Sequence, residues 1–277
     1  MKKLFAYALI LVMLLSLAAC GKNEPETQTQ PQTVADTTEA TEPVAPETTE
    51  QVAAPEKVTV YLLESSVLLD SGKTEYFYDT DYNIISAKVY TVENEIMCTH
   101  NYEENDENGM PCVIRTVWPD GGDEQIRNLE YFMDGKLKEE RDAGSNFSGF
   151  QYDYDEKGDL AEKREYYEGN LKSVTHYGYY GEQLVAVFSE DAEGNRIAGG
   201  NIENGRIAIM SYSEHEYGYK YSNRYEYDEN GNLVKMTVII DGETASGEEY
   251  SYKAVEVDAD RAAYLLEQQK YLISTAY

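Results

Sequence analysis

The sequence has few of the residues from which metal and cofactor sites are usually built. Its 277 residues include 3 Cys, 3 His and 1 Trp. So few cysteines exclude a disulfide-rich scaffold and a Cys-rich zinc domain, and we expect no metal site and no cofactor. Basic residues are also scarce, because 23 Lys and Arg stand against 52 Asp and Glu. A chain with a net charge of −29 is not expected to bind nucleic acid, since phosphate contacts need clustered Lys and Arg.

The sequence motifs of common enzyme classes are missing as well. The chain has no G-x-S-x-G nucleophile turn, no P-loop and no H-E-x-x-H zinc motif. Its many carboxylates could supply a pair for glycoside hydrolysis, but their abundance makes any single pair uninformative. We therefore expect a protein that is not an enzyme, with a glycan-acting hydrolase as a minor alternative.

The chain begins with a pattern that is typical of an export signal. Lys2 and Lys3 precede an apolar run over residues 4–19, which is short for a spanning helix but suits a signal-peptide core. The run ends in Leu-Ala-Ala-Cys-Gly at residues 17–21, which resembles the bacterial lipobox. That resemblance implies that residues 1–19 are a lipoprotein signal peptide and that Cys20 carries the lipid. The expected location is the bacterial cell membrane, lipid-anchored on its extracytoplasmic face.

The segment after Cys20 has the composition of a linker. Residues 21–56 hold five of the 7 prolines, many Thr and Glu, and no aromatic residue. Such a segment cannot bury enough apolar surface to offset the entropy of ordering it. We therefore expect residues 20–56 to be a disordered, acidic, lipid-anchored tether. Residues 57–277 carry every tyrosine except Tyr7 and form the expected folded domain.

Turn signals recur along the expected domain at nearly even spacing. Glycines beside Asp, Asn or Glu, as in Asp134-Gly135 and Asp241-Gly242, follow one another mostly at 11 to 14 residues or about twice that. Such dipeptides favour hairpin turns that need positive φ. One strand and one turn therefore take about 12 residues.

The intervening segments alternate with the period of a β-strand. The odd-numbered residues of one segment form a single face that is rich in tyrosine: Tyr217, Tyr219, Tyr221, Tyr225 and Tyr227. A tyrosine ring packs across strands while its hydroxyl remains hydrated. This face is our candidate binding surface, together with Trp118 beside the turn at Gly121 and Gly122. Packing of the same rings inside the domain is the alternative.

Two turn segments resemble a known repeat family. Residues 224–233 (Arg-Tyr-Glu-Tyr-Asp-Glu-Asn-Gly-Asn-Leu) and 152–160 (Tyr-Asp-Tyr-Asp-Glu-Lys-Gly-Asp-Leu) resemble the YD repeat of Rhs-type bacterial proteins. Residues 131–137 and 166–171 are more similar to MORN-type repeats. Elsewhere the pattern departs, as at Tyr82, which stands where the repeat has glycine. Both families imply hairpins in series, so we expect a mainly β domain: an antiparallel meander of repeated hairpins that forms an extended, curved sheet.

The end of the chain changes from strand to helical spacing. Asp258 or Asp260 is a plausible cap, and apolar residues then recur as on one face of a helix up to Leu272. We expect one C-terminal α-helix over about residues 260–272. It would pack on the sheet or cover one of its edges.

Cys98 and Cys112 are the two remaining thiols. A disulfide between them would close a loop of about 15 residues and is possible outside the cytoplasm. A turn at residues 106–109 would instead pair Cys98 with Val117. The sequence leaves the bonded and the free states open.

These features together favour a membrane-anchored surface lipoprotein of bacteria that serves as a non-catalytic binding or adhesion module. Its partners would be the membrane, through the lipid on Cys20, and an unknown protein or glycan. A structural envelope scaffold without a small ligand is the main alternative.

Overall fold

The computed structural model describes residues 56–69, 71–213 and 220–273, which form sixteen strands and one helix. The strands are β1 (Lys57–Leu68), β2 (Gly72–Tyr78), β3 (Ile84–Tyr90), β4 (Ile96–Asn105), β5 (Pro111–Val117), β6 (Gln125–Tyr131), β7 (Leu137–Asp142), β8 (Gly149–Tyr154), β9 (Leu160–Tyr167), β10 (Asn170–Tyr180), β11 (Gln183–Asp191), β12 (Arg196–Glu203), β13 (Arg206–Tyr212), β14 (Tyr221–Tyr227), β15 (Leu233–Ile240) and β16 (Glu243–Asp258). The helix is α2 (Ala259–Leu272). The signal-peptide and tether predictions, including Cys20, lie outside the described residues.

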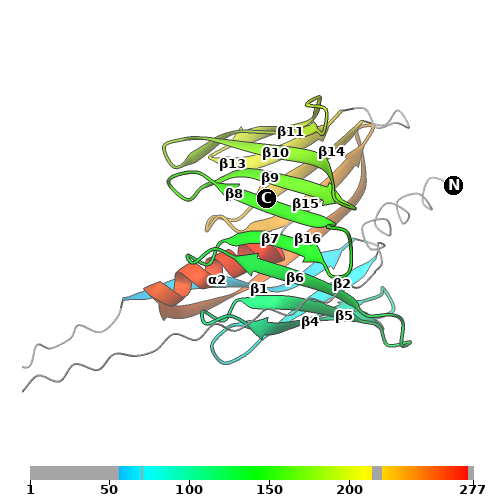
Figure 1. Ribbon diagram of the computed structural model, residues 1–277, viewed down its shortest axis with the longest axis vertical. Helices are drawn as coiled ribbons and strands as arrows, with labels where there is room; N and C mark the ends of the chain where they lie inside the picture. The colour runs from blue at the N-terminus through cyan, green and yellow to red at the C-terminus, as the bar shows by residue number, and fades with distance from the viewer. Residues whose placement is uncertain (1–55, 70, 214–219, 274–277) are drawn as a thin grey trace, which may run out of the picture.

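The strands form a closed barrel (Figure 1). Each strand pairs antiparallel with the next, and β1 pairs with β16 from Lys57 opposite Asp258 to Leu68 opposite Glu248. The predicted extended, curved sheet is therefore wrong, because the sheet has no free edge. Turn spacing and strand alternation are the same in an open and a closed meander. Closure depends instead on the register between the first and the last strand, which no local pattern records.

The barrel has two ends with different turns. We call the end formed by the turns after the even-numbered strands β2 to β14 the plugged end, because α2 begins there. The turns after the odd-numbered strands form the far end. Arg261, in the first turns of α2, donates from Nη1 to the Asn108 carbonyl at 2.6 Å and from Nη2 to the Asp81 carbonyl at 3.2 Å. These contacts fasten the helix to two neighbouring turns of the plugged end.

Asp side chains organise the turns of the plugged end. Asp228 Oδ1 accepts from the backbone N–H of Asn230 at 2.9 Å and of Asn232 at 2.8 Å, and Gly231 takes φ +89°. Asp79, Asp106 and Asp155 accept the same two bonds in their own turns. Tyr82, where the repeat has glycine, holds φ +64°. The Asp carboxylate satisfies N–H groups that the tight turn leaves free, so the turn forms even with a less favourable residue.

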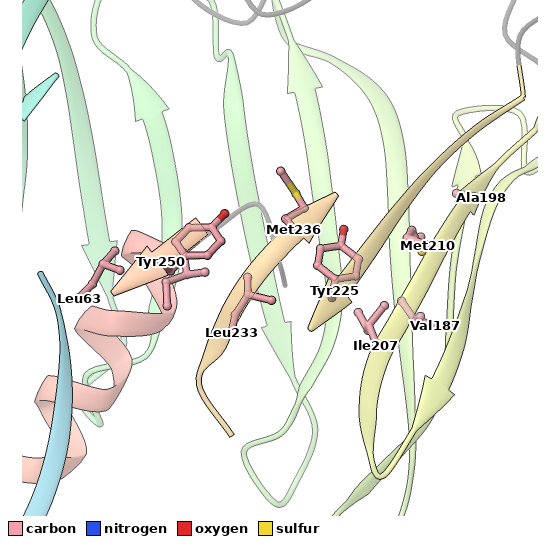
Figure 2. Close-up of a cluster of buried hydrophobic side chains, with 10 residues drawn as sticks. Leu63, Val187, Ala198, Ile207, Met210, Tyr225, Leu233, Met236 and Tyr250 are labelled. Carbon is pink, nitrogen blue, oxygen red and sulfur yellow. The ribbon is translucent and has the colours of Figure 1, made fainter. Parts of the chain in front are cut away.

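Alternation along each strand divides the wall into an inner and an outer face. Inner residues of neighbouring strands, such as Tyr225, Leu233 and Met236, pack together in the largest buried cluster (Figure 2). The outer residues between them are largely charged. Lys235 and Glu249 flank the inner residues Met236 and Tyr250, and their side chains bond at 2.8 Å across β15 and β16.

Helix α2 lies inside the ring of strands rather than on an edge. Ala262 and Leu265 pack against Val60 and Val255 of the joined first and last strands. At the other end of the helix, Tyr271 packs with the buried cluster of β5 to β9. Contacts with both walls place the helix in the interior, as the red ribbon in Figure 1 shows. The predicted helix is present within a residue of its predicted bounds and packs against the sheet, on its inner face. The alternative that it covers an edge is wrong, because a closed barrel offers no edge.

Cys98 and Cys112 are free thiols, so the possible disulfide is not formed. Strands β4 and β5 pair Thr99 with Val117 and Asn105 with Pro111, which puts the two cysteines at different levels of the barrel.

Among the described residues, no helix is long and apolar enough to cross a membrane.

Candidate functional site: the barrel interior

Tyrosine hydroxyls fasten successive hairpins to one another near the plugged end. The Tyr154 hydroxyl donates to the Leu137 carbonyl at 2.9 Å, one hairpin earlier in the chain. Leu137 and Tyr154 belong to one buried cluster, so the same residues supply packing and the hydrogen bond. We call this contact the tyrosine latch. It recurs in four further pairs: Tyr78 with Leu63, Tyr131 with Pro111, Tyr227 with Ile207, and Tyr252 with Leu233.

A charged group lies on the inner face of β6 and β7. Arg127 donates from Nη1 to Glu140 Oε1 at 2.6 Å and from Nε to Asp142 Oδ1 at 3.2 Å. The Glu140 side chain is 5% exposed, whereas that of Arg127 is 42% exposed. A buried carboxylate is stable only with such a partner, because its hydration is lost. The pair is therefore fixed by the fold, with the carboxylate buried and the Arg127 side chain partly exposed.

Tyrosines surround Glu140 in the interior. Burial raises the pKa of Tyr102, Tyr152 and Tyr271 well above the ordinary range, and the nearby Glu140 carboxylate raises each further. The three phenols come from β4, β8 and α2, so residues far apart in sequence converge on one carboxylate. Burial likewise raises the pKa of Tyr76 to about 12. These hydroxyls remain neutral donors and acceptors at physiological pH.

His100 faces the same interior from β4. Its Nδ1 lies 2.8 Å from Thr116 Oγ1 across the strand pair. Burial lowers the pKa of His100 to about 4, and the charge of Arg127 contributes to the shift. The imidazole is therefore neutral at physiological pH and adds a polar, uncharged group to the barrel interior.

Several inner side chains border space rather than packed protein. Tyr212 lies opposite the buried Ala198 and Tyr221, yet 37% of its surface is accessible. Desolvation still raises the pKa of Tyr212, so protein surrounds the ring. Arg127 combines an inner position with an accessible guanidinium in the same way. Rings of sixteen strands are wide enough to leave a lumen that side chains do not fill. Accessible surface on Arg127 and Tyr212 shows that packing around these two inner side chains is incomplete.

The structure places the predicted binding residues partly in this interior. Tyr225 is 7% exposed in the core and the Tyr227 hydroxyl bonds to the Ile207 carbonyl, so both are structural. Tyr221 faces inward beside Tyr212, with ring centroids 4.8 Å apart. Tyr217 and Tyr219 lie outside the described residues. Trp118 is partly buried in the connection after β5, where its carbonyl accepts from the Gly121 N–H at 3.1 Å.

The inner charges Arg127, Glu140 and Asp142 were not predicted from the sequence. One signal was available, because Arg127 shares strand parity with the apolar residues Leu129 and Tyr131. A charge on the apolar face of a strand indicates either a buried pair or a lined cavity. Glu140 could not be found in this way, since Glu139 and Glu140 are neighbours and only the register with β6 decides which one faces inward.

Comparisons with known proteins give structural matches but no sequence matches. No protein-family model matches the sequence, and the search of curated proteins finds no match. Among solved structures, a porin-like protein from Bacteroides uniformis ATCC 8492 is similar over 72% of this chain and 96% of its own, at 10% identity and a TM-score of 0.44. The TcdB2-TccC3 structure is similar over 69% of this chain but only 14% of its own, at 10% identity and a TM-score of 0.28. A closed barrel is also the architecture of outer-membrane proteins, and the chain shares that general type of fold.

Proposed function

We propose that this chain is a bacterial surface lipoprotein whose barrel is a non-catalytic binding module, held at the membrane by lipid on Cys20. The observation that carries the proposal is the division of the barrel wall, with ionic pairs outside and tyrosines with a few paired charges inside. Lipobox-like residues 17–21 supply the anchor, and the acidic linker 21–56 separates it from the barrel.

The outer face supports a barrel that stands beside the membrane rather than in it. Arg115 bonds to Glu103 at 3.1 Å, and Lys138 bonds to Glu130 at 2.5 Å, with side chains 31% to 57% exposed. These residues alternate with inner ones such as Tyr102 and Leu129. A barrel that spans a bilayer carries an apolar outer band about 25 Å tall, and each Lys or Arg at its midplane costs about 2–4 kcal/mol. Charged pairs on this wall therefore favour contact with water.

The inner face supports binding rather than transport. Helix α2 occupies the plugged end, and Arg261 fastens it to the turns there. A continuous aqueous channel would need both ends open. A barrel interior that is closed at one end and carries aromatic and polar side chains favours a bound molecule over a channel.

The anchor is tested with the full-length chain in bacteria that process lipoproteins. Cys20→Ala is expected to abolish incorporation of labelled palmitate and to release the protein from the membrane fraction. Cys112→Ala, which removes a partly exposed thiol elsewhere, is the matched control and is expected to retain both properties. Palmitate labelling or membrane retention that survives Cys20→Ala contradicts the proposed anchor.

A further inference from the structure

One wall of the barrel departs from the charged pattern of the outer face. Of the large apolar side chains that are exposed in the described residues, half fall within residues 67–97, from the end of β1 to the start of β4. Val67 is 44% exposed, Val92 60% and Ile96 42%. Apolar side chains that gather on a surface mark a contact with another molecule or with a membrane, whereas scattered ones need no explanation.

These side chains form one continuous patch. Val67 lies opposite Lys73, Lys73 opposite Tyr90, and Tyr90 opposite Ile96, so a single row crosses β1, β2, β3 and β4 near the far end. Val67, Lys73 and Val92 also border one shallow hollow of about 300 Å³ between the turns after β1 and β3. We call Val67, Lys73, Tyr90, Val92 and Ile96 the β1–β4 patch.

The polar groups of this wall suit a boundary between water and lipid. Lys73 Nζ lies 4.8 Å from the centre of the Tyr90 ring, and Lys88 Nζ lies 5.1 Å from that of Phe77. Glu75 is bonded to Lys73 at 2.6 Å, so it leaves no free negative charge between the two lysines. Lysines with apolar stems along aromatic rings reach phosphate groups, and tyrosine is favoured at the level of lipid headgroups.

The patch also lies on the strand that continues from the proposed tether. Strand β1 begins at Lys57, directly after residues 21–56, and Val67 lies about 33 Å further along it. As a coil, residues 21–56 would span about 30–35 Å on average. The start of β1 and the patch therefore come within reach of the same bilayer when the barrel rests on this wall.

We propose that the β1–β4 patch rests on the phospholipid bilayer that holds the lipid of Cys20, and this inference rests on the proposed anchor. The apolar side chains enter the boundary between headgroups and acyl chains, while Lys73 meets the phosphate groups. Glu93 and Glu95, in the turn after β3, oppose a strong attraction to anionic lipid, so apolar contact drives the binding. The contact gives the anchored barrel one preferred orientation.

The test is tryptophan fluorescence of the full-length protein, purified from bacteria and reconstituted on vesicles of phosphatidylethanolamine and phosphatidylglycerol. Trp118 is the one tryptophan of the chain, so Trp118→Phe is the background in which Val92→Trp reports on the patch. The matched control is Met133→Trp, since Met133 is 98% exposed in the turn after β6. Lipids brominated on their acyl chains quench rings that reach them. We expect Val92→Trp to be quenched about threefold more than Met133→Trp, and equal quenching overturns the proposal.

Charged substitutions then locate the contact. Ile96→Asp, combined with Val92→Trp, is expected to reduce quenching to the level of Met133→Trp, because a carboxylate is costly at the lipid boundary. Val185→Asp is the matched control, since Val185 is 53% exposed on the distant strand β11, and quenching is expected to stay unchanged. Thermal melting checks folding, and Val67→Asp carries the test if Ile96→Asp does not fold. Quenching that survives in the folded patch variant overturns the β1–β4 patch as the contact.

The outcomes separate this inference from the proposed anchor. Palmitate labelling that depends on Cys20, together with unquenched Val92→Trp, overturns the bilayer contact alone. If that protein also sediments as a dimer until Ile96→Asp is introduced, the patch belongs to a second copy of the chain. Quenching of Val92→Trp without palmitate labelling contradicts the anchor and leaves the bilayer contact standing.

Discussion

The two ends of the barrel are built differently. At the plugged end a small set of contacts repeats from hairpin to hairpin, namely the tyrosine latch and an Asp that bonds two N–H groups of the turn. At the far end the Asp contact also occurs, because Asp191 accepts from the N–H groups of Glu193 and Asn195 between β11 and β12, but the connections differ more in length. Strands β9 and β10 are joined by Glu168 and Gly169, whereas residues 118–124 join β5 and β6. The interior follows the same division, with packed leucines and α2 at one end and accessible polar groups at the other.

The difference between the two ends indicates which positions tolerate changes in sequence. The repeated contacts join neighbouring hairpins, so a change at one of them disturbs the ring and its helix. The far-end connections differ more in length, as loops on a rigid scaffold commonly do when they carry function. We therefore expect stability to depend mainly on the plugged end and binding on the far end.

The largest expected effect comes from the helix packing at the plugged end. Leu265 is fully buried against Val60 and Val255, so Leu265→Ala is expected to lower the free energy of unfolding by about 3 kcal/mol. Its neighbour Leu266 is 49% exposed, and Leu266→Ala is expected to cost less than about 1 kcal/mol. Urea unfolding followed by circular dichroism measures both. Equal losses would show that α2 is not packed through this face.

The next effect concerns pH and the buried His100 of β4. Burial lowers the pKa of His100 to about 4 from an unfolded value of 6.5, so below pH 6.5 the unfolded chain binds a proton that the folded chain does not. The His100 contribution to stability is therefore complete above pH 6.5 and declines as pH falls toward 4. We expect this decline to reach up to about 2 kcal/mol, after allowance for solvent at the partly exposed ring.

The measurement is the urea midpoint between pH 7.5 and 4.5, with His100→Gln as the comparison. The variant removes the titrating ring, so its stability is expected to fall less over this range. A pH dependence that is unchanged in His100→Gln would assign the decline to other groups.

A smaller effect is expected at each tyrosine latch. Tyr154→Phe keeps the ring against Phe132 and Leu137 and removes only the hydrogen bond to the Leu137 carbonyl, so it is expected to cost about 1 kcal/mol. Tyr180→Phe, at an exposed turn of the same end, is expected to change stability negligibly. Thermal melting compares the two. If Tyr154→Phe melts with the unchanged protein, the latch contributes packing alone.

The smallest effect is expected on the outer wall. Lys235 and Glu249 are 35% and 52% exposed, and Lys235→Ala is expected to change the free energy of unfolding by less than about 0.5 kcal/mol. Melting curves at low and high salt measure this contribution. A loss above about 1 kcal/mol would show that outer ion pairs, rather than the interior, support this part of the ring.

The parts of the fold that follow from local chemistry could be predicted from the sequence. An Asp followed three residues later by a Gly, as at Asp228 and Gly231, indicates a turn. The alternation of side chains along the strands places Tyr225 and Met236 on one face of the sheet. The C-terminal helix is predicted from its spacing within a residue of its observed ends. Each of these depends on neighbours within a few residues, which a single sequence displays directly.

The candidate site could be predicted only in part. Of the tyrosines proposed for binding, Tyr221 packs against Tyr212, whereas Tyr225 is buried in the core and the Tyr227 hydroxyl bonds to the Ile207 carbonyl. The grouping of Arg127 with Glu140, Tyr102 and Tyr271 depends on the register of β6 and β7 and on the entry of α2 into the ring, which exist only once the barrel is closed.

The sequence by itself determined the turns, the alternating strands and the terminal helix, because these require only local hydrogen bonding and a matching periodicity. The tertiary structure alone decided that β1 meets β16, that α2 enters the ring, and which of Glu139 and Glu140 is buried. The physical reason is that these outcomes depend on register between distant strands. A shift of one residue there turns every inner side chain outward, while the local pattern stays the same.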